Sequence, residues 1–517
     1  MGVMGRNILF ITTDQQRYDA LGCNGGTIAR TPTIDALSAH GITYDRAHPQ
    51  NVVCMPSRST MLTGQHVRTH GVWMNGVPLP ADAPSVASVL HASGYRTALF
   101  GKAHFEPFLD PTLQFAENRM GVDGTFGPHR GFEHMETATH TAVGFTHYAR
   151  MMMSEHADVV KGWYRVLDRN FDVNAEGGGD TGAAQVWENA VPRDLYHTDW
   201  VAQRTIAYLD ALPDDADFFV WVSFPDPHHP WDPPASEKHR VDWRDLALPE
   251  NYPRDATERE AILDSKPKQW RGYYDGTLVA NYEAPRRFVP AEMTADQVRE
   301  VNAMAHIENE LIDEACASIL SCIGGRGWDE RTDVFYTTDH GELQGDFGLL
   351  FKGAYHCDAL MRLPLIWRPA PGDGANAATP TRVSRPVGLL DLAPTWCSIA
   401  GVPVPEWIEG RPLPTDDRDA DERGFEHVIT EWDSTYEAES MHLRTVCCDG
   451  WVCTVYEPGS VHDGTEGELY DLADDPLQRA NRWDDPACKN RRAELVELLA
   501  TALPDRRADL APVVANV

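Results

Sequence analysis

The sequence lacks the signatures of a disulfide-rich, secreted or membrane-spanning protein. Its ten cysteines are scattered over 517 residues without a Cys-x-x-Cys pair, so we expect free thiols, most of them buried. No apolar run approaches the roughly 20 residues of a membrane span. The apolar stretch 8–11 is too short for a signal-peptide core, and no small-residue cleavage site follows it. These absences predict a cytoplasmic protein that does not associate with a membrane.

Positive charge is also scarce. The chain has 45 Lys and Arg against 78 Asp and Glu, which gives a net charge of −33. This balance disfavours nucleic acid and anionic membrane surfaces as partners, because both are bound through Lys and Arg. An anionic small-molecule substrate would need positive charge concentrated locally in its site. Hydrophobic residues still make up 42% of the chain, which is typical of a folded globular protein.

Short apolar runs alternate with helical patterns along most of the chain. The runs predict strands over 8–12, 96–100, 218–224 and 333–338, and helices over 33–40, 85–93 and 304–323. Apolar strands separated by helices favour the α/β class, with a mostly parallel central sheet covered by helices on both faces.

The pattern changes after an acidic stretch at 416–422. Strands are predicted over 427–432, 442–448 and 451–456, and a helix over 491–502. We therefore divide the chain into an α/β domain over 1–424 and a smaller α+β unit over 425–517, an antiparallel sheet with a helix. Segments near 106–200 and 231–300 follow strand ends and are interpreted as insertions, either pocket walls or surface decoration.

Polar side chains follow each of the four predicted strands of the first domain. They are Asp14 and Gln15, then Lys102 and His104, then Asp226, His228 and His229, and finally Asp339 and His340. The carboxyl ends of parallel strands meet at one edge of a sheet, and that edge is where such folds bind ligands. The sequence therefore predicts one site of carboxylates, imidazoles and an ammonium group.

Residues 54–64 read Cys-Met-Pro-Ser-Arg-Ser-Thr-Met-Leu-Thr-Gly. Pro56 suits the first turn of a helix that ends at Gly64, which puts Cys54 at the positive end of that helix, beside Arg58. Such a position lowers a thiol pKa and attracts anions. The alternative from the residues alone is a buried cysteine with a packing role.

This stretch resembles the signature of the type I sulfatases, C-x-P-S-R-x-x-x-L-T-G, with every defined position filled. The resemblance extends from Asn7 to the segment 468–476. It implies an alkaline phosphatase-like fold. It also implies that a maturation enzyme oxidises Cys54 to Cα-formylglycine, whose hydrated aldehyde is the nucleophile.

The same resemblance implies a metal site for one divalent cation. Its ligands would be Asp14, Asp339, His340 and the modified residue 54, with Gln15 in place of a second aspartate. Oxygen-rich ligation favours Ca²⁺, whereas the imidazole and the loss of one carboxylate make Mn²⁺ the alternative.

The resemblance also implies roles around the nucleophile. Arg58 would hold the hydrate, Lys102 and Lys352 would bind the sulfate oxygens, and His104 would contact the second hydroxyl. His228 would protonate the leaving oxygen and His229 would line the pocket. Asn75 is similar to an active-site asparagine of the phosphonate monoester hydrolases.

Three functions follow, in order of preference. The first is a sulfatase acting on an aryl or small alkyl sulfate, favoured by the Lys102-x-His104 pair. The second is a phosphonate monoester or phosphodiester hydrolase with the same machinery, which this chain resembles at Asp14 and Gln15, Asn75, Asp339 and His340, and Lys352. The third is a silent metal-binding protein, which would hold if Cys54 is never oxidised. The family resemblance further implies a homo-oligomer.

Overall fold

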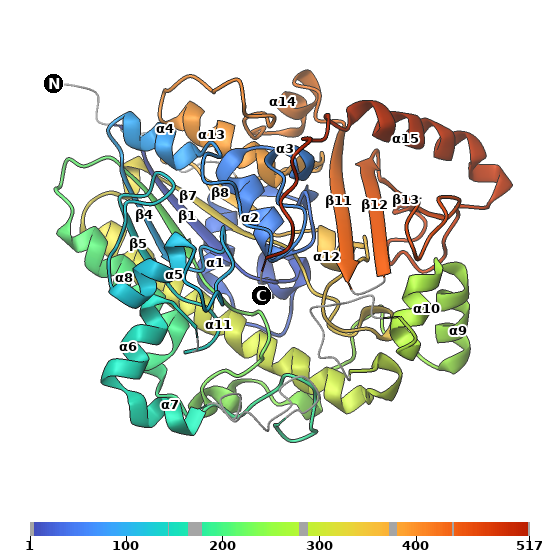
Figure 1. Cartoon of the computed structure of the whole chain (residues 1–517), viewed down its shortest axis with the longest axis horizontal. Helices are drawn as coiled ribbons and strands as arrows, with labels where there is room; N and C mark the ends of the chain where they lie inside the picture. Colours follow the sequence, from blue (N-terminus) through green and yellow to red (C-terminus); the bar gives the residue numbers. More distant parts are fainter. Residues whose placement is uncertain are drawn as a thin grey trace.

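The computed structural model describes residues 5–142, 144–163, 178–278, 288–371, 380–436 and 439–514. An eight-stranded sheet runs through the larger part of the molecule in the order β5-β4-β6-β1-β7-β8-β2-β9 (Figure 1). Its strands are β1 (Asn7–Thr13), β2 (Ile42–Tyr44), β4 (Arg96–Gly101), β5 (His134–Thr137), β6 (Phe218–Ser223), β7 (Thr332–Thr338), β8 (Leu365–Arg368) and β9 (Thr381–Val383). A two-stranded sheet pairs β3 (Ala47–His48) with β10 (Val387–Gly388).

The five strands from β5 to β7 are all parallel, and only β8 runs against its neighbours. These central strands are apolar on both faces, as strands covered by helices must be. In β1, Leu9 and Ile11 point into one core cluster, whereas Ile8 and Phe10 point into the other. The sheet thus separates two cores.

Helices cover both faces of the sheet. The helices α1 (Pro32–Ala39), α8 (His197–Ala211) and α11 (Ala295–Gly325) enclose the core that contains Leu9. The helices α2 (Cys54–Thr63), α4 (Val86–Ala92) and α13 (Leu392–Ile399) enclose the other. The remaining helices are α3 (Val67–His70), α5 (Ala116–Asp123), α6 (His147–Glu155), α7 (Ala157–Trp163), α9 (Ala256–Ser265), α10 (Lys268–Asp275), α12 (Asp358–Met361), α14 (Asp417–Glu422) and α15 (Lys489–Ala502).

The predicted α/β class and all four predicted strands of the central sheet are confirmed, with shifts of at most one residue at each end. Two predictions need correction. The helix predicted over 304–323 begins at Ala295, where a capping box between Thr294 and Gln297 starts it in a polar stretch. The segment 106–200 is not wholly an insertion, because β5 within it pairs with β4.

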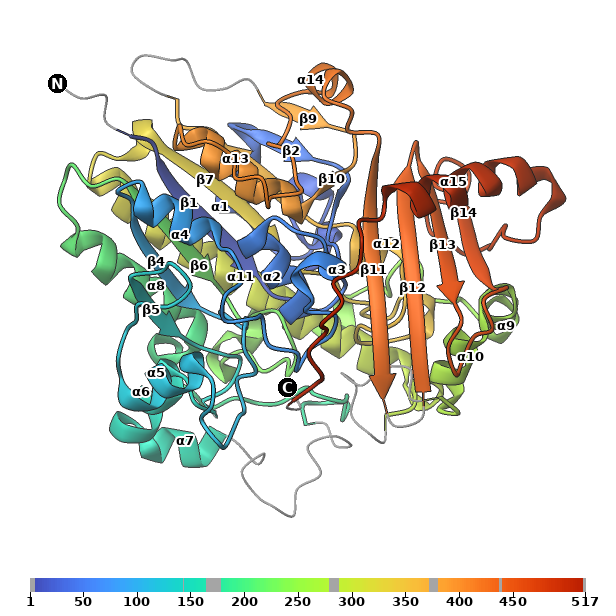
Figure 2. The same ribbon diagram turned by 45° about the horizontal axis from the view of Figure 1, so that its top comes forward.

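The C-terminal part forms a four-stranded antiparallel sheet beside the larger one (Figure 2). Its strands are β11 (His427–Tyr436), β12 (Glu439–Cys448), β13 (Trp451–Glu457) and β14 (Gly467–Asp471), and α15 packs against it. Strand β14 contains the start of the segment 468–476 and was not predicted. The division of the chain at residue 425 stays a prediction.

Lys266 joins the segment 231–300 to this second sheet. It lies between α9 and α10 with its side chain fully buried, 3.6 Å from the Glu468 carboxylate of β14. Its Nζ donates to the Tyr470 hydroxyl and the Gln478 carbonyl, both at 2.7 Å. Nζ also lies over the ring of Trp270, 4.3 Å from its centre. This buried ammonium group therefore helps to hold α9 and α10 against the sheet, together with Trp270, whose Nε1 donates to the Glu468 carboxylate at 3.1 Å.

The segment after α15 returns to the larger part of the molecule, where Figures 1 and 2 show it ending near the centre. The Arg507 amide donates to the Arg68 carbonyl at 3.0 Å, and the Val514 amide donates to the Gly76 carbonyl at 2.9 Å. The Trp73 indole donates to the Ala511 carbonyl at 2.9 Å. The far end of the described chain is thus tied to the loop after α3.

All ten cysteines lie in the described chain and are free thiols, eight of them buried, as predicted. None of the described helices combines the length and the apolar character needed to cross a bilayer.

We expect Lys266→Met to lower the free energy of unfolding by about 3–5 kcal/mol, because loss of one partner leaves the buried Glu468 carboxylate uncompensated. Denaturant unfolding followed by tryptophan fluorescence measures this loss. The matched control is Lys268→Met, since that side chain is 58% exposed and its ion pair with Glu466 is worth about 0–1 kcal/mol. Equal losses in the two variants would contradict the role given to Lys266.

Candidate active site

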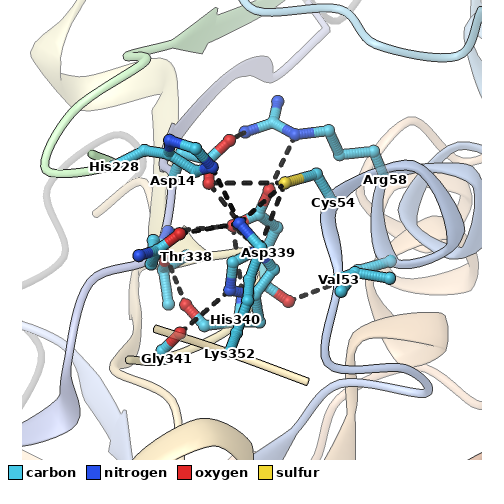
Figure 3. Close-up of polar contacts among 12 residues, drawn as sticks. Asp14, Val53, Cys54, Arg58, His228, Thr338, Asp339, His340, Gly341 and Lys352 are labelled. Carbon is cyan, nitrogen blue, oxygen red and sulfur yellow. Dashed lines mark hydrogen bonds and ion pairs between the residues drawn. The ribbon is translucent and has the colours of Figure 1, made fainter. Parts of the chain in front are cut away.

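Four strands deliver polar side chains to one place at the carboxyl edge of the central sheet. Asp14 follows β1, Lys102 follows β4, His228 follows β6 and Asp339 follows β7. The first turn of α2 brings Cys54 to the same place from the side. Figure 3 shows Asp14, Cys54, His228 and Asp339 pointing toward one another from different elements. The structure thus brings together the residues that the sequence places at separate strand ends.

Cys54 lies at the centre of this group and is 1% exposed. Its Sγ is 3.2 Å from His340 Nε2, 3.6 Å from Asp14 Oδ1 and 3.6 Å from Lys352 Nζ. The expectation of a lowered thiol pKa is wrong. Burial, together with the charge of Asp14, raises the pKa of Cys54 to about 12 and outweighs the opposing effect of the nearby lysines. An unmodified Cys54 is therefore a neutral thiol.

Arg58 is fully buried between the two aspartates. Its Nε donates to Asp339 Oδ2 at 2.8 Å, and its Nη2 donates to Asp14 Oδ2 at 3.3 Å. Nη1 donates to the Lys102 carbonyl at 2.6 Å and to the Ser223 hydroxyl at 2.7 Å. The guanidinium group therefore fixes the carboxylates and the ends of β4 and β6, rather than bonding to Cys54 itself.

Asp14 also pairs with Lys102, whose Nζ lies 2.5 Å from Oδ2. Burial alone would raise the pKa of Asp14, but the charges of Lys102 and Arg58 outweigh it and hold the pKa well below the ordinary value. The carboxylate is therefore ionised and available as a ligand.

His340 has the tautomer of a metal ligand. Its Nδ1 lies 2.9 Å from the Gly341 carbonyl, which can only accept, so Nδ1 carries the proton. The lone pair of Nε2 then faces Cys54 and the two aspartates. One ligand atom from each of Asp14, Cys54, Asp339 and His340 lies within 4.8 Å of all the others, and all four residues are buried. This donor set fits a divalent cation.

Gln15 occupies a left-handed backbone position, with φ of 66°, and its amide donates to Asp339 Oδ1 at 3.1 Å. Its side-chain oxygen accepts from Lys352 Nζ at 2.7 Å, and its nitrogen donates to Glu342 Oε2 at 2.5 Å. Metal ligation by Gln15 would therefore compete with its bond to Lys352.

Glu342 was not identified from the sequence, although it follows His340 by only two residues. Besides Gln15, it accepts from the amides of Phe351 at 2.5 Å and Gln344 at 3.3 Å. Burial raises its pKa to about 7, against the opposing charge of Lys352. The carboxylate ties together the two loops that carry the candidate metal ligands and Lys352.

His228 accepts a hydrogen bond from Lys352 Nζ at Nε2, at 2.7 Å, and its Nδ1 lies 2.5 Å from the His229 carbonyl. Burial and the Lys352 charge lower the pKa of His228 well below 6.5. Its ring stacks on His229, at 4.1 Å between ring centroids. It also stacks on His140, at 4.2 Å between ring centroids and with an interplanar angle of 6°. Sequence reasoning missed His140, which follows the unpredicted strand β5.

His104 and Asn75 complete the group. His104 follows β4 with φ of 56° and is 3% exposed. The Asn75 side-chain oxygen accepts from the Met55 amide at 2.9 Å, so Asn75 supports the first turn of α2 next to Cys54. His70 and His356 lie outside this group and bond to Thr60 and Thr445 in the packed interior.

A sulfatase family model matches residues 6–402 of the chain. The chain is 24% identical over 503 residues to the uncharacterized sulfatase YidJ of Escherichia coli K12, covering 95% of this chain and 86% of that protein. It is 24% identical over 533 residues to an arylsulfatase of Clostridium perfringens, covering 97% and 95%.

Among solved structures, the phosphonate monoester hydrolase of Agrobacterium radiobacter superposes with a TM-score of 0.77 at 22% identity, over 96% of this chain and 95% of that chain. At this identity the likeness establishes the fold, and it confirms the alkaline phosphatase-like architecture.

We expect Arg58→Lys to lower the free energy of unfolding by about 3 kcal/mol or more, because an ammonium group cannot replace the forked bonds to both aspartates. Thermal and denaturant unfolding of the protein measure this. Arg254→Lys is the control, since Arg254 is 81% exposed and pairs with Glu258 on the surface. A change below about 0.5 kcal/mol in both variants would show that Arg58 does not hold the site together.

Proposed function

This chain belongs to the sulfatase family of sulfuric ester hydrolases, and we propose that it cleaves an aryl or small alkyl sulfate to the alcohol and inorganic sulfate. We further propose that Cys54 is converted to formylglycine, and that a divalent cation binds beside it. The observation that carries the proposal is the convergence of Asp14, His340 and Lys352 on the Sγ of one buried cysteine within the signature 54–64.

The donor chemistry supports a cation at Asp14, Asp339, His340 and residue 54. Two carboxyl groups and one imidazole whose Nε2 carries no proton suit Ca²⁺, with Mn²⁺ as the alternative. When bound, the cation would lower the pKa of a hydroxyl on residue 54 and offset charge on the ester oxygens. Arg58 would keep both aspartates in place for it.

The cationic side chains near Cys54 suit an anionic ester. The Nζ atoms of Lys102 and Lys352 lie 3.7 and 3.6 Å from the Sγ of Cys54, in a site that is nearly closed to water. Ammonium groups fixed in a desolvated site stabilise charge that develops on non-bridging oxygens. This local positive charge is what an anionic substrate requires in a chain with a net charge of −33.

Proton transfer is assigned to two histidines. His228 would protonate the leaving oxygen, and its Nε2 lies 2.7 Å from the Lys352 Nζ that would bind the sulfate oxygens. One such acid contributes about 10²–10⁴-fold to the rate. A hydrated formylglycine would supply both an attacking hydroxyl and a second hydroxyl, whose deprotonation expels sulfate by C–O cleavage. His104 would take the proton of that second hydroxyl.

A phosphonate monoester hydrolase is the second candidate. Gln15 and Asn75 favour it, and the solved phosphonate monoester hydrolase shares the fold over 96% of this chain. Lys102 and His104 favour the sulfatase, because that pair matches the sulfatase pattern at the end of β4. Cytoplasmic location, a maturation enzyme as partner and assembly as a homo-oligomer stay predictions.

The first test compares an aryl sulfate with the matching aryl phosphonate ester on protein made with a maturation enzyme. We expect preferential turnover of the sulfate, and we expect Cys54→Ser to lower it on the order of 10⁶-fold, as loss of a nucleophile does. Cys488→Ser, in the distant C-terminal part, is the control and should retain activity. Undiminished turnover in Cys54→Ser would exclude the proposed nucleophile, and a large phosphonate preference would favour the second candidate.

The second test removes the cation. Chelation should abolish turnover and lower the melting temperature, because a ligand that binds only the folded state stabilises it. Adding back Ca²⁺ or Mn²⁺ separately should restore both. Metal analysis should find one bound ion per chain in the wild type and none in His340→Ala. The control is His91→Ala, which changes a half-exposed side chain on α4 and should keep the ion. Full metal occupancy in His340→Ala would contradict the assigned ligands.

A further inference from the structure

The backbone and the ring of His228 are held by different groups. The Asp226 carboxylate accepts from the Thr198 hydroxyl and lies against His197 Nε2, both at 2.6 Å. The Asp14 amide donates to the Asp226 carbonyl at 3.1 Å. These bonds fix the chain two residues before His228. They do not set the rotation of its ring, because the terminal torsion of a histidine has only broad preferences. The ring orientation must come from contacts with the imidazole itself.

The contacts with this ring come from its own loop and from two other loops. Nδ1 lies 2.5 Å from the His229 carbonyl, and the two rings stack at 4.1 Å and 26°. Because His229 is the next residue in the chain, it moves with His228 and cannot fix it. From the loop after β7, Lys352 places its Nζ 2.7 Å from Nε2. From the loop after β5, His140 stacks on the ring at 4.2 Å between centroids, with an interplanar angle of 6°.

The contact with Lys352 changes in the course of the proposed reaction. Its Nζ also donates to Gln15 Oε1 at 2.7 Å and lies 3.6 Å from the Sγ of Cys54. In the proposed function this ammonium group binds the sulfate oxygens, and it has only three N–H bonds to share among its partners. The stack on His140 uses the face of the His228 ring and does not occupy Nε2. It can therefore persist while Nε2 faces the leaving oxygen.

His140 is itself fixed against the central sheet. The Ala138 amide donates to the Gly101 carbonyl at 3.0 Å, which extends the pairing of β5 with β4 beyond the end of the strand. His140 follows two residues later and is buried, and the Phe108 ring packs against it edge-on, at 6.3 Å and 85°. Aromatic pairs have preferred geometries, so a buried ring in a fixed plane limits the planes open to its neighbour. The sheet thus sets the orientation of the His228 ring through His140.

We propose that His140 is a positioning residue that holds the His228 ring in the plane from which it protonates the leaving oxygen; this rests on the proposed function. In that step sulfur exchanges the alcohol oxygen for an oxygen of residue 54. The electron pair of the broken S–O bond stays on the alcohol oxygen, which takes a proton from His228 and leaves as the alcohol. A proton donor must lie within hydrogen-bond reach of that oxygen, so a ring that has turned away donates poorly.

His140→Ala separates positioning from general damage when two esters are compared on protein made with a maturation enzyme. Phenyl sulfate needs a proton at its leaving oxygen, so kcat/KM should fall by about 10- to 10²-fold, as it does when a catalytic group is misplaced. The nitrophenolate released from 4-nitrophenyl sulfate is already stable, so its kcat/KM should change by less than about twofold. The ratio of the two values is independent of the amount of active enzyme. Partial misfolding or incomplete conversion of Cys54 therefore cannot produce the change.

Two further variants complete the experiment. His140→Phe keeps a flat ring at this position and should restore the ratio to that of the wild type. The matched control is His134→Ala, because His134 also stacks on a ring, that of Phe126 at 4.9 Å and 20°, but lies at the start of β5, away from the carboxyl edge. This variant should leave the ratio unchanged. A merely structural His140 predicts an equal loss for both esters in His140→Ala.

A readout without turnover is available in crystals of the unmodified chain. We expect one orientation of the His228 ring in the wild type and in His140→Phe, and a rotated ring or several orientations in His140→Ala. An unchanged His228 ring in His140→Ala, equal losses for both esters, or a ratio that stays altered in His140→Phe would overturn the positioning role. Absence of turnover of both esters by the mature wild type would instead overturn the proposed function, and the role of His140 would fall with it.

Discussion

Arg58 is a fully buried cation between two fully buried carboxylates, and the arrangement of the site follows from that placement. Asp14 and Asp339 come from strands far apart in the sequence, and side by side without solvent they would repel each other. Arg58 offsets this repulsion with a planar group that bonds to both and also to the ends of β4 and β6. Because Arg58 lies one turn after Cys54 on α2, the same helix places both the counter-charge and the proposed nucleophile.

The net charge of this chain is negative, whereas the site contains a cluster of cationic side chains. The chain as a whole is strongly acidic, whereas Lys102 and Lys352 lie within 3.7 Å of one thiol and Arg58 pairs with Asp14 beside it. In low-dielectric surroundings these cations interact strongly with an anion, and at a distance the acidic surface offers it little attraction. Selectivity for anions is therefore a property of contact inside the site rather than of long-range steering.

The sequence predicted those parts of the fold that depend on long apolar runs. Strands β1, β4, β6 and β7 were found because each is continuous and buried on both faces. Strands β2, β5, β8 and β9 have only three or four residues, too few for a periodic signal. Grouping of side chains at strand ends was predictable because parallel topology imposes it.

What the sequence could not supply depends on neighbours from other loops. His140 meets His228, and Glu342 meets Gln15, only through folded geometry. The pKa of Cys54 was predicted in the wrong direction because its helix position was visible in the sequence, whereas its burial was not.

Every residue of α2 is buried, and the loop that follows α3 is tied down by the segment 507–514 near the end of the described chain. No enzyme could take hold of residues 54–63 in this closed state. The conversion proposed for Cys54 would therefore have to precede this closure. The rate of folding would then compete with the proposed oxidation.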